Sequence, residues 1–312
     1  MKVPFLDLKL LYQDLKEEYE KGILLSIQSG CYVGGDKVSK FEQDYANYSE
    51  ANYCVGVANG LDALKIALRT INISHGDEII VPSHTFIATW LAVTECGAVP
   101  VPVEVCPETF NINPKEIENA ITKNTKAIIP VHLYGQPANL DEICNIASKY
   151  NLYVIEDAAQ AHGAKYKGKK IGSHGHIVAW SFYPGKNLGA FGDGGAIVTN
   201  NDELSEKIKW WRSWGAAKKY HHEIKGGNSR LDSIQAAVLN VKLKYIDQFN
   251  SEREQHAKMY TNLISNHDKH RGSQVSAITA KTGPPIFKVM TRRGCSRCDL
   301  YHQLSLLLLA QT

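Results

Sequence analysis

The feature of this sequence that most constrains its fold is an alternation of short apolar runs with helix-like segments between residues 53 and 157. The apolar runs have the length of strands, and each is followed by a segment whose apolar residues recur at helical spacing. This alternation predicts an α/β fold with a mostly parallel sheet flanked by helices, and ligands of such sheets gather at the carboxyl ends of the strands. The predicted strands span residues 53–58, 78–82, 99–104, 127–133 and 152–157.

Length and composition set the domain plan. With 312 residues, of which 44% are hydrophobic, the chain is long enough for a large domain and a smaller appendage. We expect a large domain over residues 1–248, which begins with an N-terminal helix at 8–29, and a partial or divergent small domain over 249–312. The longest apolar run, residues 306–310, is far too short to cross a bilayer.

Charge and cysteine usage exclude several classes of protein. The chain holds 35 Lys and Arg against 32 Asp and Glu, and its basic excess comes from residues 267–312 alone, so no folded domain carries a nucleic-acid footprint. Seven scattered cysteines do not resemble a disulfide framework and predict a reduced, cytoplasmic protein. Cys295 and Cys298 have the spacing of zinc ligands, but no matching second pair completes a site, and we expect no metal.

A glycine-rich stretch at residues 179–200 places Lys186 between two apolar segments. Lysine forms imines with carbonyl compounds, and enzymes that use this reaction keep the amine in a partly desolvated pocket that lowers its pKa. Ser181, five residues earlier, offers a hydroxyl that could bind a cofactor phosphate. Most lysines are solvated surface residues, so this interpretation needs support from the rest of the chain.

Two further segments are candidates for ligand contacts. The strand at 53–58 leads through Gly60 and Leu61 into a helix, and a helix N-terminus beside a tight turn favours phosphate. Asp157 follows a buried run, with Gln160 one turn later, and a carboxylate there could pair with a protonated ring nitrogen. Each segment has an alternative interpretation as an ordinary helix cap, and the residues alone leave both alternatives open.

Several motifs occur in a fixed order over roughly residues 3–250: FLDL, GCYVGG, VGVANGLDAL, VPSHTFIAT, PVHLYGQPA, IEDAAQAHGA, SFYPGKNLGAFGDGG and NSRLDSIQAA. Through these motifs the chain resembles the StrS-type (DegT–StrS) sugar aminotransferases. That family consists of fold type I enzymes that use pyridoxal 5'-phosphate to aminate nucleotide-linked keto sugars. The residues of these motifs are similar to those of enzymes that act on dTDP-3-keto-6-deoxyhexoses. Several motifs in the family's order make coincidence improbable, whereas any one alone would be weak.

The resemblance implies a role for each residue that matches a motif. Lys186 would bind the cofactor covalently and move the proton, and Asp157 would pair with the pyridine nitrogen. Phe86 would stack on the ring, and Gln160 would reach the ring's 3-oxygen. The phosphate would be held by the backbone of Gly60 and Leu61 and by the hydroxyl of Ser181.

Two further residues match the family at the edge of the site. The resemblance places Tyr183 near the sugar and sends Asn228 to the cofactor phosphate of a neighbouring subunit, which implies a homodimer with shared active sites. A glycine-flanked asparagine before a long helix is also a favoured helix cap, so this alternative stays open for Asn228.

The implied activity is transamination in amino-sugar biosynthesis, with L-glutamate as donor, 2-oxoglutarate as its product, and a nucleotide-linked keto sugar as acceptor. A truncated or regulatory cofactor-binding homologue is the alternative. A nicotinamide-binding enzyme is disfavoured because no G-x-G-x-x-G follows the first strand. A dehydratase relative would call for histidine in place of Lys186.

The tail at residues 267–312 departs from the family's motifs. Its basic character, its Gly, Pro and Ser content and its abrupt apolar end resemble a sequence read out of frame or a degraded terminus. A divergent tail that still folds is the alternative. In both cases the motifs predict an intact cofactor site and leave the sugar site in question.

Overall fold

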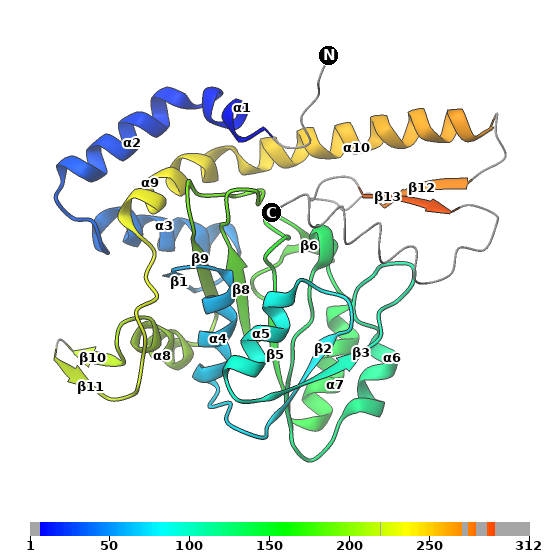
Figure 1. Ribbon diagram of the computed structural model, residues 1–312, viewed down its shortest axis with the longest axis horizontal. Helices are drawn as coiled ribbons and strands as arrows, with labels where there is room; N and C mark the ends of the chain where they lie inside the picture. Colours follow the sequence, from blue (N-terminus) through cyan, green and yellow to red (C-terminus); the bar gives the residue numbers. More distant parts are fainter. Residues whose placement is uncertain (1–6, 219, 270–273, 279–285, 291–312) are drawn as a thin grey trace.

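The computed structural model describes residues 7–218, 220–269, 274–278 and 286–290 (Figure 1). Its centre is a seven-stranded sheet in the order β1-β9-β8-β5-β4-β2-β3, in which only β9 runs antiparallel to its neighbours. The mostly parallel α/β sheet expected from the alternation is therefore confirmed. The strands are β1 (Tyr53–Val57), β2 (Glu78–Pro82), β3 (Val99–Val103), β4 (Thr125–Ile128), β5 (Tyr153–Asp157), β8 (Ile177–Ser181) and β9 (Gly195–Thr199).

Helices cover both faces of this sheet (Figure 1). Successive side chains of a strand point to opposite faces, so Ile79 and Val81 pack under one helical layer and Ile80 under the other. One layer consists of α4 (Gly60–Thr70), α5 (Ile87–Glu95) and α8 (Asp202–Arg212). The other consists of α3 (Gly35–Tyr48), α6 (Pro114–Ile117) with η1 (Glu118–Ala120), α7 (Leu140–Tyr150) and α9 (Ser233–Lys242).

The N-terminal segment forms two helices, α1 (Leu8–Gln13) and α2 (Lys16–Gln28), so the prediction of one helix over 8–29 is wrong. The break lies at Leu15, whose φ of −127° is not helical. The change of direction lets α2 bury Tyr19 completely against Val238 of α9. Tertiary burial of an aromatic ring thus outweighs the helical periodicity of the segment.

A long helical rod crosses the molecule. After α9 the chain stays helical through η3 (Leu243–Tyr245) into α10 (Ile246–Lys269), and Figure 1 shows this rod lying along one edge of the sheet domain. The predicted domain boundary at residue 248 falls inside α10, whose Ile246 is buried in the core of the large domain. The division into domains stays a prediction.

Shorter elements complete the described chain. Three two-stranded ribbons are present: β6 (Lys165–Tyr166) with β7 (Lys169–Lys170), β10 (Ala216–Lys218) with β11 (His221–His222), and β12 (Gln274–Ile278) with β13 (Ile286–Met290). None of the helices in these ranges is long and apolar enough to cross a membrane. The predicted zinc-like pair Cys295 and Cys298 lies outside the described residues.

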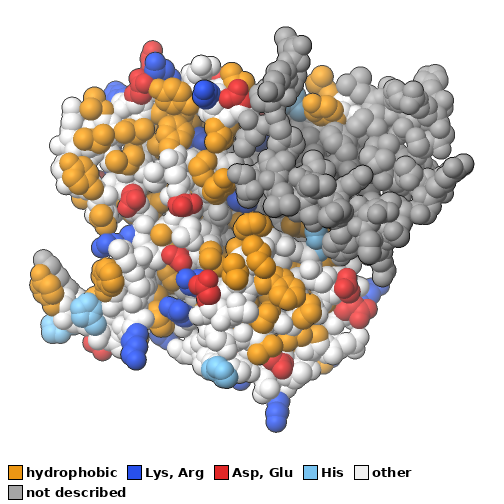
Figure 2. All heavy atoms as spheres, in the orientation of Figure 1, with side chains coloured by type: hydrophobic (Ala, Val, Ile, Leu, Met, Phe, Trp, Pro, Cys, Tyr) orange, Lys and Arg blue, Asp and Glu red, His pale blue; other side chains and the backbone are white. Residues whose placement is uncertain are grey.

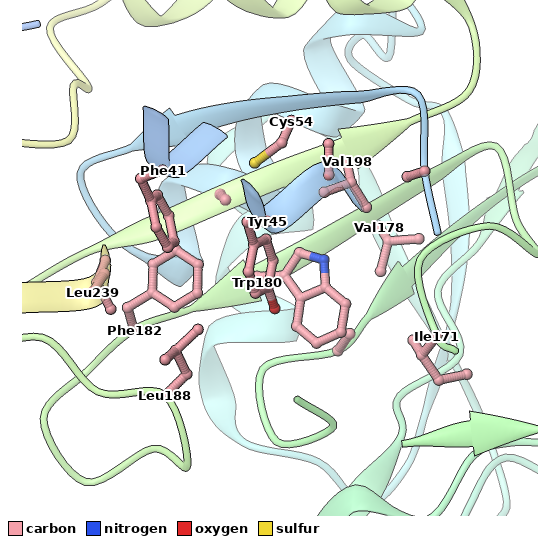
Figure 3. Packing of buried hydrophobic residues seen from close by; sticks show 14 of the residues in the cluster. Phe41, Tyr45, Cys54, Ile171, Val178, Trp180, Phe182, Leu188, Val198 and Leu239 are labelled. Atoms are coloured by element: carbon pink, nitrogen blue, oxygen red, sulfur yellow. The ribbon is translucent and has the colours of Figure 1, made fainter. Parts of the chain in front are cut away.

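An aromatic core lies beneath the end of β8 (Figure 3). Trp180 packs edge-on against Tyr45 at a ring-centroid distance of 5.4 Å, and Phe182 packs against Phe41 at 5.2 Å. All four rings are buried. Because side chains alternate along a strand, the residue between Trp180 and Phe182 points to the other face. That residue is Ser181, and the aromatic core therefore fixes the strand end that presents it.

Candidate active site

The N-terminus of α4 and the end of β8 form a cradle with free hydrogen-bond donors. Asn59 caps the helix by accepting a hydrogen bond from the backbone N–H of Asp62 at 2.8 Å. The backbone N–H groups of Gly60 and Leu61, in the first turn, have no intrahelical acceptor. A Cβ at Gly60 would lie 2.6 Å from Cβ of Ser181, so only glycine allows this approach. The helix is capped by Asn59, and the first N–H groups of α4 remain as donors of the kind that suits an anion.

Asp157 ends β5 with a buried carboxylate that is held at two points. Thr89 of α5 donates its hydroxyl hydrogen to Oδ2 at 2.8 Å, and the backbone N–H of Ala159 donates to Oδ1 at 3.2 Å. The segment from Asp157 to β6 consists of turns, so the alternative that this carboxylate caps a helix is wrong. Among the described residues both donors to this carboxylate are uncharged, and such a buried carboxylate suits a protonated ring nitrogen.

Lys186 lies on the loop between β8 and β9, where its backbone N–H donates to the carbonyl of Tyr183 at 2.8 Å. The turn that follows requires glycine at 189, because a Cβ there would lie 2.3 Å from the carbonyl oxygen of Pro184. Burial lowers the pKa of the Lys186 amine below its usual value, and the negative charge of Asp157 partly opposes this effect. The interpretation as a fully solvated lysine is therefore wrong.

Gln160 follows Asp157 by three residues, and Phe86 precedes the helix that carries Thr89. The side-chain oxygen of Gln160 accepts a hydrogen bond from the backbone N–H of Tyr134 at 2.7 Å, which leaves its NH₂ group as a donor. That orientation suits contact with an oxygen atom on a ligand. Phe86 is the N-cap residue of α5, the helix that also carries Thr89, and its side chain is 62% exposed. An exposed ring at this position is available for stacking on a planar ligand.

Tyr183 and Asn228, the two residues expected at the edge of the site, lie in different parts of the chain's surface. Tyr183 is 46% exposed on the Lys186 loop. Asn228 is exposed, and its backbone bridges to Ser213 beyond the end of α8, so the described contacts do not connect it to the Lys186 loop of its own chain. The N-cap of α9 is Asp232, and the alternative that Asn228 caps this helix is therefore wrong.

Two buried residues that the sequence analysis did not single out, His132 and Glu156, stabilise the backbone next to Asp157. Nδ1 of His132 accepts a hydrogen bond from the backbone N–H of Ala138 at 3.1 Å, so Nε2 carries the proton and donates it to Glu156 at 2.8 Å. Both side chains are fully buried. The backbone N–H of His132 also donates to the carbonyl of Asp157 at 3.0 Å. The sequence did contain a sign of this pair, because a glutamate inside the apolar run of β5 must be buried and therefore needs a hydrogen-bond partner.

The site has donors for a phosphate at one end, a carboxylate for a ring nitrogen at another, and a lysine amine that can attack a carbonyl carbon. These are the features of a phosphorylated aromatic aldehyde with a basic ring nitrogen, and pyridoxal phosphate fits them. No cluster of three or more histidine, cysteine, aspartate or glutamate side chains suited to a metal ion occurs within the described ranges.

Comparisons with known proteins give the same family as the motifs. The dTDP-3-amino-3,4,6-trideoxy-alpha-D-glucose transaminase of Streptomyces venezuelae is 50% identical over 303 residues, which cover 97% of this chain and 79% of that relative. The crystal structure of DesV from S. venezuelae in complex with a ketimine intermediate has a TM-score of 0.88 and 45% identity, and the match covers 98% of this chain and 81% of that chain. NtdA from Bacillus subtilis with bound cofactor PMP has a TM-score of 0.86 and 34% identity, over 97% and 69% of the two chains.

The family match itself extends over most of the sequence. The pattern of the DegT/DnrJ/EryC1/StrS aminotransferases matches residues 13–305, and so reaches into the tail that the motifs left unassigned. Because this match agrees with the identity to curated relatives and with the likeness to solved structures, the chain belongs to the DegT/DnrJ/EryC1/StrS aminotransferase family.

Proposed function

We propose that this chain transfers the amino group of L-glutamate to the keto group of a nucleotide-linked deoxy sugar, with pyridoxal 5'-phosphate as cofactor. A dTDP-3-keto-6-deoxyhexose is the proposed acceptor, supported by the name of the S. venezuelae relative. The observation that carries the proposal is the position of Lys186, a partly buried lysine on the loop that follows β8, the strand paired with the β5 strand that Asp157 ends. The family and its solved members support the reaction type and the cofactor.

The chain's own groups would bind and orient the cofactor. The first N–H groups of α4 and the Ser181 hydroxyl hold the phosphate, Phe86 covers the ring, and the NH₂ group of Gln160 donates to the ring's 3-oxygen. When bound, pyridoxal phosphate supplies an electron sink for the charge left on a carbon that loses a proton. The Asp157 carboxylate keeps the ring nitrogen protonated, which strengthens that sink.

Lys186 would move the proton. Because burial lowers its pKa, a larger share of the amine is neutral at a given pH and able to accept a proton. Nζ would take the proton from Cα of the amino donor as a base and then, as an acid, deliver it to C4′, the aldehyde carbon of the cofactor. The same steps in reverse aminate the keto sugar, so glutamate and sugar would react in turn at one site.

We also propose a homodimer with shared active sites. Figure 2 shows apolar side chains gathered over α1 and α2 and again over α5. Leu24, Leu25 and Ile27 of α2 are each about half exposed, as are Phe86 and Ile87 at the start of α5. Apolar surface of this kind marks interaction sites, and a two-fold axis would pair equal patches. The exposed position of Asn228 agrees with a contact to the partner's phosphate.

The reaction would take place in a reducing compartment, and we propose the cytoplasm. The support is that the five cysteines of the described residues are free thiols. No nucleic acid or membrane is part of the proposed reaction.

The deciding experiment is covalent trapping followed by an assay. Purified protein is incubated with pyridoxal phosphate, reduced with borohydride and digested, and mass spectrometry should find the pyridoxyl group on Lys186. The unreduced protein should then convert glutamate to 2-oxoglutarate and aminate a dTDP-linked keto sugar, and Lys186→Ala should abolish both half-reactions. Labelling of Lys186 without turnover on any nucleotide keto sugar would favour a regulatory cofactor-binding protein, and labelling elsewhere would contradict the assignment.

A further inference from the structure

Three polar side chains lie in one row along the rod formed by α9, η3 and α10. Gln235, Lys242 and Asn250 follow one another at intervals close to two helical turns, which places them on the same side of the rod. Lys242 is 6% exposed and Asn250 is 5% exposed. Buried polar groups require hydrogen-bond partners, so the partners of these side chains show which segment the row fixes in place.

The row contacts the loop that carries Lys186 at three successive points, in reverse chain order. Each contact is a hydrogen bond between a side chain of the rod and a residue that follows Lys186 within five positions, and the loop residue is the donor in two of the three. The bonds are Phe191 N to Gln235 Oε1 at 2.9 Å, Lys242 Nζ to Gly189 O at 2.7 Å, and Asn187 Nδ2 to Asn250 Oδ1 at 2.9 Å.

The third contact extends to the other side of the active site. The NH₂ group of Asn250 donates to the backbone carbonyl of His162 at 2.8 Å. His162 lies five residues after Asp157, in the turn segment that follows β5. Asn250 therefore joins the loop of Lys186 to the segment of Asp157.

The loop depends on such external contacts for its position. Between β8 and β9, the side chain of Leu188 is fully buried in the aromatic core, and Figure 3 shows it pointing toward Phe182. Within the described part of the chain, the backbone N–H of Lys186 donates locally, to the carbonyl of Tyr183. Residues 187–191 thus attach the loop to the rest of the molecule. Their contacts determine the position of the Lys186 backbone, from which its side chain extends.

We propose that Gln235, Lys242 and Asn250 are positioning residues for Lys186, which hold residues 187–191 against the rod so that the amine stays opposite Asp157. None of the three reaches the reacting atoms in this arrangement, and each acts through the backbone or side chain of the loop. The proposal rests on the function proposed above for Lys186. It adds that a helix outside the sheet determines the geometry of the catalytic pair.

The test compares two lysines of the same rod. Lys242→Met removes the donor to Gly189 and keeps a long apolar side chain, whereas Lys244→Met removes an exposed lysine that pairs with Glu18. Hydrogen exchange is measured by mass spectrometry on the full-length protein without cofactor. In Lys242→Met, a peptide covering residues 183–192 should exchange at least tenfold faster than in wild type, while peptides from β1 and β9 stay unchanged. Lys244→Met should behave as wild type throughout.

A second measurement follows Lys186 itself. After a short pulse of pyridoxal phosphate and borohydride, the labelled fraction of Lys186 should fall at least fivefold in Lys242→Met and stay constant in Lys244→Met. Asn250→Asp provides an independent variant, because an aspartate can accept from Asn187 but cannot donate to the carbonyl of His162. Its peptide at 183–192 should exchange several-fold faster than wild type, with unchanged strands.

The outcomes separate the two proposals. If exchange at 183–192 matches wild type in both Lys242→Met and Asn250→Asp, or rises equally in every strand, the positioning role is wrong. If wild-type protein carries its label on another lysine, the function proposed for Lys186 is wrong, and the exchange data still show whether the rod holds the loop. If Lys242→Met does not fold, Asn250→Asp decides the matter alone.

Discussion

The hydroxyl of Thr89 donates a hydrogen bond to the carboxylate of Asp157 at 2.8 Å, and this bond connects α5 to the end of β5. Thr85 extends the connection, since its hydroxyl lies 2.9 Å from that of Thr89. A carboxylate held in this way cannot rotate freely. The bond therefore fixes the direction in which the Asp157 carboxylate faces.

Thr89→Val should weaken cofactor binding. Without this bond the Asp157 carboxylate can turn away and must be reoriented when the cofactor binds. If the full cost of a lost hydrogen bond to a charged group, about 1.5–3 kcal/mol, falls on binding, the Kd of pyridoxal phosphate rises about tenfold or more. Absorbance titration of the purified variant measures that Kd. Thr89→Ser keeps the hydroxyl and should bind within about threefold of wild type. Thr94→Val, which removes an exposed hydroxyl bonded only within its own helix, is the control.

Gly60→Ala should close the phosphate cradle. The new Cβ would lie 2.6 Å from Cβ of Ser181, a distance that forces α4 away from β8. Equilibrium dialysis should show binding of pyridoxal phosphate reduced about a hundredfold, corresponding to roughly 3 kcal/mol. Gly22→Ala is the matched control, because its Cβ would meet only ordinary contacts in the middle of α2. It should raise stability by about 0.5–1 kcal/mol and leave cofactor binding intact. Equal binding by both variants would show that no phosphate lies at Gly60.

Glu156→Gln should destabilise the fold around Asp157. The carboxylate of Glu156 accepts from Nε2 of His132 and from the backbone N–H of Gly175, so an amide would turn its NH₂ group toward one of these donors. An unsatisfied buried donor costs about 1–3 kcal/mol. Urea unfolding of the protein without cofactor measures the loss. Glu95→Gln, which affects a partly exposed pair with Lys65, should change stability by less than about 1 kcal/mol. Similar losses in the two variants would contradict the role of the buried pair.

The stability contribution of Lys242 should depend on pH. Burial and the nearby charge of Arg253 lower the pKa of the Lys242 amine to about 8 from a usual value of 10.5. Between these two values the unfolded chain binds more protons than the folded one, so this group favours the folded state increasingly as pH rises from about 8 to 10.5. Urea unfolding of wild type and Lys242→Met is compared at a series of pH values. The difference should shift toward wild type by up to about 3 kcal/mol over this range, and a difference that stays constant would show that the amine keeps its usual pKa in the folded protein.

Two inactive variants should restore activity when mixed if the active site is shared. Lys186→Ala lacks the base, and Asn228→Ala would lose a hydrogen bond to the partner's phosphate, worth about 1.5–3 kcal/mol. In a mixed dimer one site has both lesions and the other has neither. At limiting cofactor, activity should rise toward a quarter of the wild-type sites after subunit exchange. Exchange shown by labelled subunits without any gain in activity would mean that Asn228 serves its own subunit.

Local sequence was sufficient for much of the fold and for the candidate residues. Apolar runs at 53–58, 78–82 and 152–157 predicted β1, β2 and β5, because a buried strand needs apolar side chains on both faces. The glycines around Lys186 also predicted a tight loop correctly, since the close approach at Gly189 excludes any side chain. These features depend on neighbouring residues and are visible in a short window.

Other features required the tertiary structure. Leu15 interrupts a periodic helix because Tyr19 gains burial against α9, and the cap interpretations of Asp157 and Asn228 failed because no helix begins at either residue. Helical periodicity carries no information about which distant surface will bury a side chain.

The sequence by itself determined which chemical groups this protein has: a lysine on a glycine loop, a carboxylate at a strand end, and a helix start with free N–H groups. Only the tertiary structure decided what holds them. Thr89 reaches Asp157, and Lys242 reaches the Lys186 loop, across 68 and 53 positions of sequence. Such pairings depend on the strand order of the sheet and on the path of the rod, which result from packing of the whole chain rather than from any local pattern.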